Sequence, residues 1–291
     1  MSVLCLISNP AEPELDVSLV ATIQHEVKGE INWLNHGVCC EIIQPTAPDP
    51  LATARALIGR SPVDAVLVPL ANRRKRLLVA DMDSTMIDQE CIDELADAVG
   101  IKGEVAAITE RAMRGELDFA AALRTRVGLI KGLNRKVIEE IRRERITLAP
   151  GSRTLIQTMK THGAVTSLVS GGFTFFAEWI GKRLGFDEWV ANTLEFDGDV
   201  LSGTVAEPIV GREMKVERLE ALAAEHQIPL AQTMAVGDGA NDLDMIRAAG
   251  LGVALHAKPI VSEQAAARID HGDLTALLYL QGYAEEEFVR Q

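Results

Sequence analysis

The chain is poor in cysteine, and this shortage excludes a disulfide-stapled secreted scaffold. The sequence has 291 residues and four cysteines, at positions 5, 39, 40 and 91, none of them in a CxxC pair. A chain of this length can bury a sufficient core without covalent staples. We therefore expect reduced thiols, as in a cytoplasmic protein.

Long apolar runs are also missing. The longest apolar stretches, such as AVLVPLA at 65–71, fall far below the ~20 residues that a membrane helix needs. The first residues, MSVLCLISNP, have no basic start and too short an apolar run for a signal peptide. We expect a cytoplasmic protein that does not enter a membrane.

Positive charge is scarce relative to negative charge. Lys and Arg number 29 against 42 Asp and Glu, which gives a formal net charge of −13. Such a field disfavours nucleic acid and anionic membranes as partners, and an anionic substrate would need a local cation. The one short basic run, NRRKR at 72–76, is followed at once by an apolar strand, so we interpret it as a solvated linker.

Residues 1–71 are predicted to form a small α/β domain. Strand and helix patterns alternate there, with strands expected at 3–8, 38–45 and 64–70 and helices at 16–27 and 52–59. No catalytic constellation appears in this segment. A regulatory or docking role fits it, and the alternative is that it only dimerises the chain or covers a surface.

Residues 72–291 have a different pattern, in which strands and helices alternate from residue 77 onward. This alternation predicts a doubly wound, mainly parallel sheet. A helical block at about 88–147 directly follows the first strand and is expected to cap it. The segment 189–205, with its turn residues DGD and SG, is predicted to form a hairpin.

Three predicted strands end in polar motifs. These are DMDST at 81–85, SGG at 170–172 and GDGAND at 237–242, and Lys215 lies near the start of a helix between the last two. Each motif alone is a common turn. In a parallel sheet, however, the carboxyl ends of the strands share one edge, where ligands bind. We therefore expect these motifs to form one site.

The carboxylates of this site predict a metal. Asp81 and Asp83 directly follow a predicted buried strand. Like charges at the edge of a core need a cation or a shared proton. Together with Asp238 they offer the hard oxygen ligands that Mg²⁺ prefers.

The remaining motif residues suit a phosphate group. Ser170 has a hydroxyl to donate, and Gly171 and Gly172 allow backbone N–H groups to approach an anion at a helix start. Lys215 supplies a compact positive charge. A carboxylate screened by Mg²⁺ and Lys215 can act as a nucleophile and form an aspartyl-phosphate.

DMDST, SGG, the isolated Lys215 and GDGAND resemble the four motifs of the haloacid dehalogenase-like phosphohydrolases. A more specific resemblance is to the members of that family that hydrolyse O-phospho-L-serine. It rests on Glu90, nine residues after Asp81, and on the cap segment RTRV at 124–127. The resemblance covers about residues 76–285. It implies a Rossmannoid core with a helical cap, and residues 1–71 resemble a single, divergent ACT-type domain.

Carried over to this chain, the resemblance implies that Asp81 is the nucleophile and Asp83 the general acid and base. It places Mg²⁺ on the Asp81 carboxylate, the backbone carbonyl of Asp83, and Asp238. The phosphoryl group would be held by Ser170, Gly171, Lys215 and Asn241. Asp242 would orient Lys215 or a metal-bound water.

The cap is expected to recognise the serine part of the substrate. The resemblance assigns Glu90 to the ammonium group and Arg126 to the carboxylate, for which a guanidinium fork is well shaped. Met113 and Phe119 would close over the substrate and exclude water. The alternatives are a solvated Glu90, an Arg126 paired with Glu116, and plain packing roles for Met113 and Phe119.

The expected reaction is Mg²⁺-dependent hydrolysis of O-phospho-L-serine to L-serine and phosphate, the last step of serine biosynthesis. One alternative keeps the chemistry with another small phosphate ester, such as phosphothreonine, or with transfer to an alcohol. Another is an amino-acid-sensing or assembly protein with a vestigial site, which predicts a broken motif, and none is broken here. We expect a homodimer.

Overall fold

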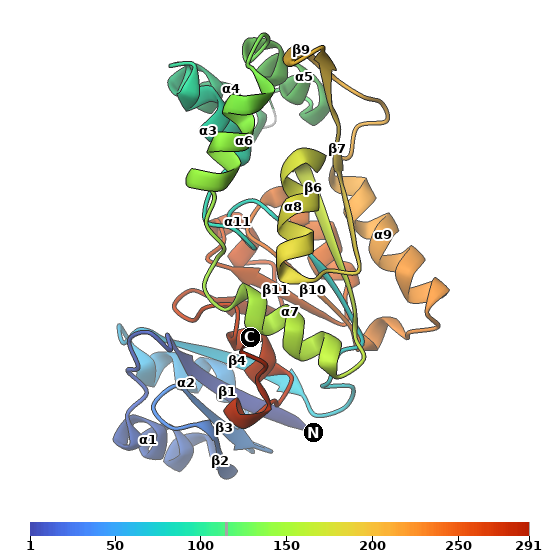
Figure 1. Ribbon diagram of the computed structural model, residues 1–291. Coiled ribbons are helices and arrows are strands. Elements are labelled where there is room, and N and C mark those ends of the chain that lie inside the picture. Colours follow the sequence, from blue (N-terminus) through green and yellow to red (C-terminus); the bar gives the residue numbers. More distant parts are fainter. Residues whose placement is uncertain (114–115, 291) are drawn as a thin grey trace.

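The computed structural model describes residues 1–113 and 116–290, except for the side chain of Met113. Three parts follow one another along the molecule: an N-terminal unit, a central sheet core, and a helical cap at the opposite end from the N-terminal unit (Figure 1). Within the described ranges, no helix combines the length and apolar character that crossing a bilayer requires.

The N-terminal unit is a four-stranded antiparallel sheet with two helices. Its elements are β1 (Ser2–Ser8), α1 (Val17–Val27), β2 (Glu30–Asn35), β3 (Cys39–Ile43), α2 (Pro50–Ile58) and β4 (Val63–Pro69). The strand order β2-β3-β1-β4 is that of a split βαββαβ unit. The sequence prediction missed β2 because half of the residues of this edge strand are exposed and the strand carries no core pattern. The ACT-type assignment stays a prediction.

The two faces of this sheet pack against different partners, because side chains alternate along a strand. Leu4 and Leu6 of β1 pack with helix α1 through residues such as Ile23. Cys5 and Ile7 instead join the large core cluster that includes the C-terminal helix α12 (Ala276–Leu280). The N-terminal unit therefore shares a continuous apolar core with the rest of the chain.

The central sheet has six strands, and every pair in it is parallel. Its strands are β5 (Leu77–Ala80), β6 (Val165–Phe173), β7 (Glu188–Asn192), β10 (Thr233–Gly237), β11 (Leu251–Leu255) and β12 (Ala267–Ile269). They lie in the order β12-β11-β10-β5-β6-β7. The predicted doubly wound parallel fold is confirmed.

Helices cover both faces of this sheet. They are α7 (Ser152–Thr161), α8 (Thr174–Leu184), α9 (Arg212–Glu225), α10 (Leu243–Ala248) and the short α11 (Pro259–Ser262). Leu78 of β5 packs with α7 and α8, and its neighbour Leu77 packs on the other face with α9. Short 3₁₀ turns lie at Leu230–Gln232, Ala240–Asp242 and Glu285–Glu287.

The predicted hairpin at 189–205 was partly wrong. Its first residues form β7, at the edge of the main sheet, and only β8 (Leu194–Asp197) and β9 (Val200–Val205) form a hairpin. The sequence could not separate these cases, because a short alternating strand reads alike in both.

The cap consists of α3 (Cys91–Ala98), α4 (Lys102–Met113), α5 (Phe119–Leu129) and α6 (Arg135–Glu144), within the block predicted at 88–147. The two segments that connect the cap to the core lie side by side, and Ile87 of one forms an isolated antiparallel β-bridge with Leu148 of the other. The β8–β9 hairpin extends the cap, since Gly132 donates its N–H to the carbonyl of Leu201 at 2.8 Å. The hairpin lies beside α5 in Figure 1.

The basic run at 72–76 is not a solvated linker, so that prediction is wrong. Lys75 is 5% exposed and its Nζ donates to the carbonyl of Ala231 at 2.8 Å. Arg73 pairs with the buried Glu41 and donates to the carbonyl of Leu280. Arg73 is half-buried and Lys75 buried, whereas the other residues of the run are exposed, and charge patterning alone carries no information about which of them the fold covers.

Candidate active site

The predicted motifs meet at the carboxyl edge of the central sheet, beneath the cap. Asp81 follows β5, Ser170 lies near the end of β6, Asp238 follows β10, and Lys215 comes from the first turn of α9. A cavity of about 290 Å³ opens there. The predicted residues in its lining are Asp81, Asp83, Glu90, Phe119, Arg126, Ser170, Gly171, Gly172, Asp238 and Asn241.

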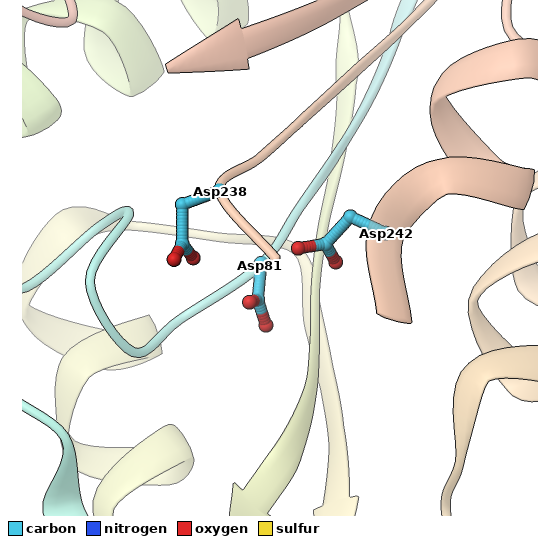
Figure 2. Close-up of side chains that lie close together, drawn as sticks. All are labelled: Asp81, Asp238 and Asp242. Atoms are coloured by element: carbon cyan, nitrogen blue, oxygen red, sulfur yellow. The ribbon is translucent and has the colours of Figure 1, made fainter. Parts of the chain in front are cut away.

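Three carboxylates form a buried group at the base of this cavity. Each of Asp81, Asp238 and Asp242 offers an oxygen atom, and these oxygens lie within 4.8 Å of one another (Figure 2). Asp242 is fully buried, and the other two are less than a tenth exposed. The carboxylate of Asp83 is not part of this group.

One ammonium group balances the three carboxylates only in part. Lys215 Nζ lies 2.7 Å from Asp81 Oδ1 and 2.5 Å from Asp242 Oδ1. Burial disfavours its charged form, but Asp242 and Asp81 outweigh burial and raise the pKa of Lys215. Burial and the nearby Asp242 raise the pKa of Asp81, against the opposing effect of Lys215.

The donor set fits a divalent cation. Three carboxylates against one ammonium leave a net negative charge in a buried place, which is costly unless a cation neutralises it. All the donors are oxygens, as hard cations such as Mg²⁺ require. The sequence prediction gave Asp242 the role of orienting Lys215 or a metal-bound water, and the structure adds that its carboxylate lies in the same buried group as Asp81 and Asp238.

Asp83 has a different environment from Asp81. It is half-buried, and its Oδ1 accepts the backbone N–H of Cys91 at 3.2 Å. Its Oδ2 lies against Gly172, where an added Cβ would come within 2.6 Å. Burial and the charge of Glu90 raise the pKa of Asp83 to about 7. This carboxyl can therefore hold or release a proton near neutral pH.

The SGG segment is rigidly supported. Ser170 is buried, and its Oγ accepts the N–H of Gly172 at 2.8 Å. The carbonyl of Gly171 accepts a hydrogen bond from the buried Asn192 at 2.9 Å, and Asn192 also bonds Val210. Asn192 was missed in the sequence because it lies in β7, which was assigned to the hairpin.

The GDGAND turn is shaped by Asp242. A Cβ at Gly237 would lie 2.3 Å from Asp242 Cγ, so only glycine fits there. The second oxygen of Asp242 accepts the N–H of Gly239 at 3.0 Å. Asn241 is thereby turned into the cavity lining.

Two charged cap residues face the cavity. Glu90 is exposed and accepts a hydrogen bond from Ser84 Oγ at 2.8 Å. Arg126 is 9% exposed and donates to two neutral oxygens, Thr109 Oγ1 at 3.2 Å and the carbonyl of Ala122 at 3.3 Å. Burial lowers the pKa of Arg126, and the charge of Glu90 opposes that effect.

The apolar cap residues are placed in part. An added Cβ at Gly171 would lie 3.0 Å from the tip of the Phe119 ring, so this ring covers the SGG segment. Met113 ends α4, but its side chain lies outside the described part of the chain. Glu116, the alternative partner proposed for Arg126, forms an ion pair with Arg111 at 3.3 Å.

The cavity also includes residues that the sequence analysis missed, among them Thr109 in the cap and Lys258 after β11. Lys258 follows the strand LGVAL, so the rule that sites lie at the carboxyl ends of parallel strands could have found it. Thr109 had no such signal, because only the packing of α4 on α5 brings it to Arg126.

Comparison with known proteins gives a consistent result. Residues 78–247 match the family model of the haloacid dehalogenase-like hydrolases. The phosphoserine phosphatase of Streptomyces coelicolor is 46% identical over 237 residues, which cover 81% of this chain and 57% of that protein. The chain thus spans little more than half the length of that relative.

Two further matches extend over nearly the whole of the compared protein. The phosphoserine phosphatase of Albidiferax ferrireducens is 44% identical over 79% of this chain and 98% of that protein. A crystal structure of a haloacid dehalogenase-family hydrolase from Salmonella enterica serovar Typhi superposes with a TM-score of 0.85 at 30% identity, covering 99% of this chain and 100% of that one.

Proposed function

This chain belongs to the haloacid dehalogenase-like hydrolases, and we propose that it hydrolyses O-phospho-L-serine to L-serine and phosphate. The observation that carries the proposal is the buried ion pair between Asp81 and Lys215 at the base of a cavity that Arg126 and Glu90 also line. The names of the relatives support the same activity.

Asp81 is the nucleophile in this proposal. One of its carboxylate oxygens attacks phosphorus, the bond from phosphorus to the serine oxygen breaks, and an aspartyl-phosphate forms. Lys215, held 2.7 Å from Asp81, favours the ionised carboxylate and so opposes burial, which raises the pKa of Asp81. Its charge also attracts the phosphate.

Asp83 moves the protons. In the first step it gives its proton to the departing serine oxygen. In the second step it takes a proton from the water that attacks phosphorus, and phosphate leaves with Asp81 restored. A pKa of about 7 suits both steps, because the group exchanges its proton readily near neutral pH.

The phosphoryl oxygens are held by the hydroxyl of Ser170, by Gly171 and Gly172, and by the amide of Asn241. Asp242 positions Lys215 through the 2.5 Å contact between them. Mg²⁺ held by Asp81, Asp238 and the Asp83 carbonyl would screen the negative charge between nucleophile and phosphate.

The serine part of the substrate is bound from the cap. Arg126 takes the carboxylate, since among the described residues its buried guanidinium donates to neutral oxygens alone. Glu90 takes the ammonium group from the rim. Phe119, with Met113, closes over the substrate and excludes water from the phosphoenzyme.

The proposal divides the chain into an N-terminal ACT-like domain at 1–71 and a phosphatase domain at 72–291. The N-terminal domain would regulate or dimerise the enzyme, which would act as a cytoplasmic homodimer in the last step of serine biosynthesis. The four cysteines are free and buried, as reduced thiols would be.

The experiment is phosphate release from O-phospho-L-serine, phosphothreonine and p-nitrophenyl phosphate, with Mg²⁺ and with a chelator. We expect fast, Mg²⁺-dependent release that favours phosphoserine, and a loss of about 10⁴-fold or more in Asp81→Asn. Cleavage of only the generic ester would leave the chemistry standing and refute the roles of Arg126 and Glu90. No cleavage by a folded, Mg²⁺-loaded chain would refute the activity.

A further inference from the structure

A series of hydrogen bonds joins the N-terminal unit to the active-site cavity. It starts at Asp64 of β4, which is 5% exposed. The Asp64 carboxylate accepts three successive backbone N–H groups from the loop after β12: Asp270 at 2.8 Å, His271 at 3.0 Å and Gly272 at 2.8 Å. One side chain of the N-terminal unit thus fixes the conformation of a core loop.

The second link is His256, directly after β11. Its ring Nε2 lies 2.7 Å from the carbonyl of Gly272, and its backbone N–H donates to the carbonyl of Ile269 at 2.8 Å. A carbonyl only accepts, so Nε2 carries the proton. His256 has a φ of 46°, in the left-handed region that is unfavourable for a non-glycine residue. Such a backbone persists where its surroundings hold it.

The third link reaches the cavity. Two residues after His256, Lys258 lines the cavity and donates its backbone N–H to the carbonyl of Asp238 at 3.2 Å. A shift of the segment 256–258 would therefore move both a cation in the cavity wall and the backbone of a carboxylate in the buried group.

We propose that Asp64 and His256 are positioning residues, which hold the segment 256–258 in place so that the docked N-terminal unit sets the activity of a site it does not line. No residue from 1–71 is among those that line the cavity. The series of hydrogen bonds through Asp64 and His256, here called the relay, nevertheless ends on Lys258 and Asp238. It therefore connects the N-terminal unit to the cavity. This inference rests on the proposed phosphatase activity.

The test compares Asp64→Asn, His256→Leu and His256→Gln with the wild type. Asn offers one acceptor oxygen in place of two, and Leu removes the ring donor. Asp64→Asn and His256→Leu should each lower kcat/KM for O-phospho-L-serine about fivefold, within the range of coupling through packed networks. His256→Gln keeps an N–H donor and should stay within about twofold. The double variant, Asp64→Asn with His256→Leu, should lose no more kcat/KM than either single variant, because both substitutions break the same series of hydrogen bonds.

A matched control breaks a different bond across the same junction. Asn35 donates to the hydroxyl of Tyr279 at 2.9 Å, away from the segment 256–258. Asn35→Ala should leave kcat/KM within about twofold of the wild type while costing a comparable hydrogen bond. Equal losses in Asn35→Ala and Asp64→Asn would overturn the proposal, since loosened docking alone would then explain both.

A second measurement does not depend on catalysis. Amide hydrogen exchange in a peptide that covers 251–262 should quicken in Asp64→Asn and His256→Leu and stay unchanged in Asn35→Ala. If the wild type is inactive but the variants differ in exchange as expected, the phosphatase function is refuted and the relay stands. An active wild type whose variants change neither kinetics nor exchange refutes the relay alone.

Discussion

The junction between the N-terminal unit and the core and the site beneath the cap hold buried charges in opposite ways. Where the N-terminal unit meets the core, Glu41 is 2% exposed and pairs with Arg73, and the Asp64 carboxylate accepts three backbone N–H groups. Under the cap, the Lys215 ammonium group contacts the carboxylates of Asp81 and Asp242, and the Asp238 carboxylate lies beside them in the same buried group.

The difference separates a structural use of charge from a chemical one. At the junction Glu41 and Asp64 have their partners within the chain, in Arg73 and in three backbone N–H groups. In the candidate site the chain leaves a buried excess of negative charge, which a divalent cation would neutralise. Uncompensated burial of this kind marks functional sites, because it costs stability and is retained only for chemistry.

The largest expected effect on stability is at the junction. Arg73→Met leaves Glu41 buried without its cation, and we expect the free energy of unfolding to fall by about 3–5 kcal/mol. Urea unfolding measures it. The control is the neighbouring Arg74→Met. The Arg74 side chain is 44% exposed and pairs with the exposed Glu287, so this substitution should cost no more than about 1 kcal/mol. Equal costs would show that the junction charges are not structural.

The next effect concerns Arg126, which has no carboxylate hydrogen-bond partner in the part of the chain that the structure describes. Arg126→Ala should lower kcat/KM for O-phospho-L-serine roughly 30-fold, the loss expected for one charge-assisted hydrogen bond, and change that for p-nitrophenyl phosphate by less than about threefold. The control on the same helix is Arg124→Ala, an exposed residue paired with Glu207. Similar losses with both substrates would remove Arg126 from the carboxylate role.

Asp238→Asn should have a smaller effect on stability, and this effect should have opposite signs with and without metal. Asp238→Asn removes one of the crowded carboxylates, so in chelator the free energy of unfolding should rise by about 1–2 kcal/mol. With Mg²⁺ present, the metal-induced increase in Tm should be lost. Thermal unfolding in both buffers measures this. A variant that destabilises the chelated chain would contradict an uncompensated cluster.

The smallest expected effect is a pH dependence at the junction. Burial lowers the pKa of Lys75 from 10.5 to about 8, so between these values the unfolded chain binds the extra proton. Stability due to Lys75 should then rise with pH from about 8 to 10.5, by an amount on the order of 1 kcal/mol. Lys75→Met should lack this rise in urea unfolding at pH 7.5 and 10. Parallel curves for both chains would place Lys75 in solvent.

Much of the active site could be predicted because its chemistry is written in short segments. Asp81, Ser170, Lys215 and Asp238 each stand at the end of a strand or the start of a helix, where local patterns are strong. The parallel sheet then brings all of them to one edge by its topology. The same patterns did not reveal Thr109 or Asn192, which reach the site only through packing between elements.

The sequence by itself determined the fold class and the family, since both follow from periodicity and from motifs that lie close together along the chain. Only the tertiary structure decided how charges are compensated. The basic run at 72–76 looked solvated, yet Arg73 pairs with Glu41 of the N-terminal sheet and Lys75 is buried, with its Nζ on the carbonyl of Ala231, and both partners lie far away in the chain. Burial is a property of the docked surfaces, so no local pattern of charge can report it.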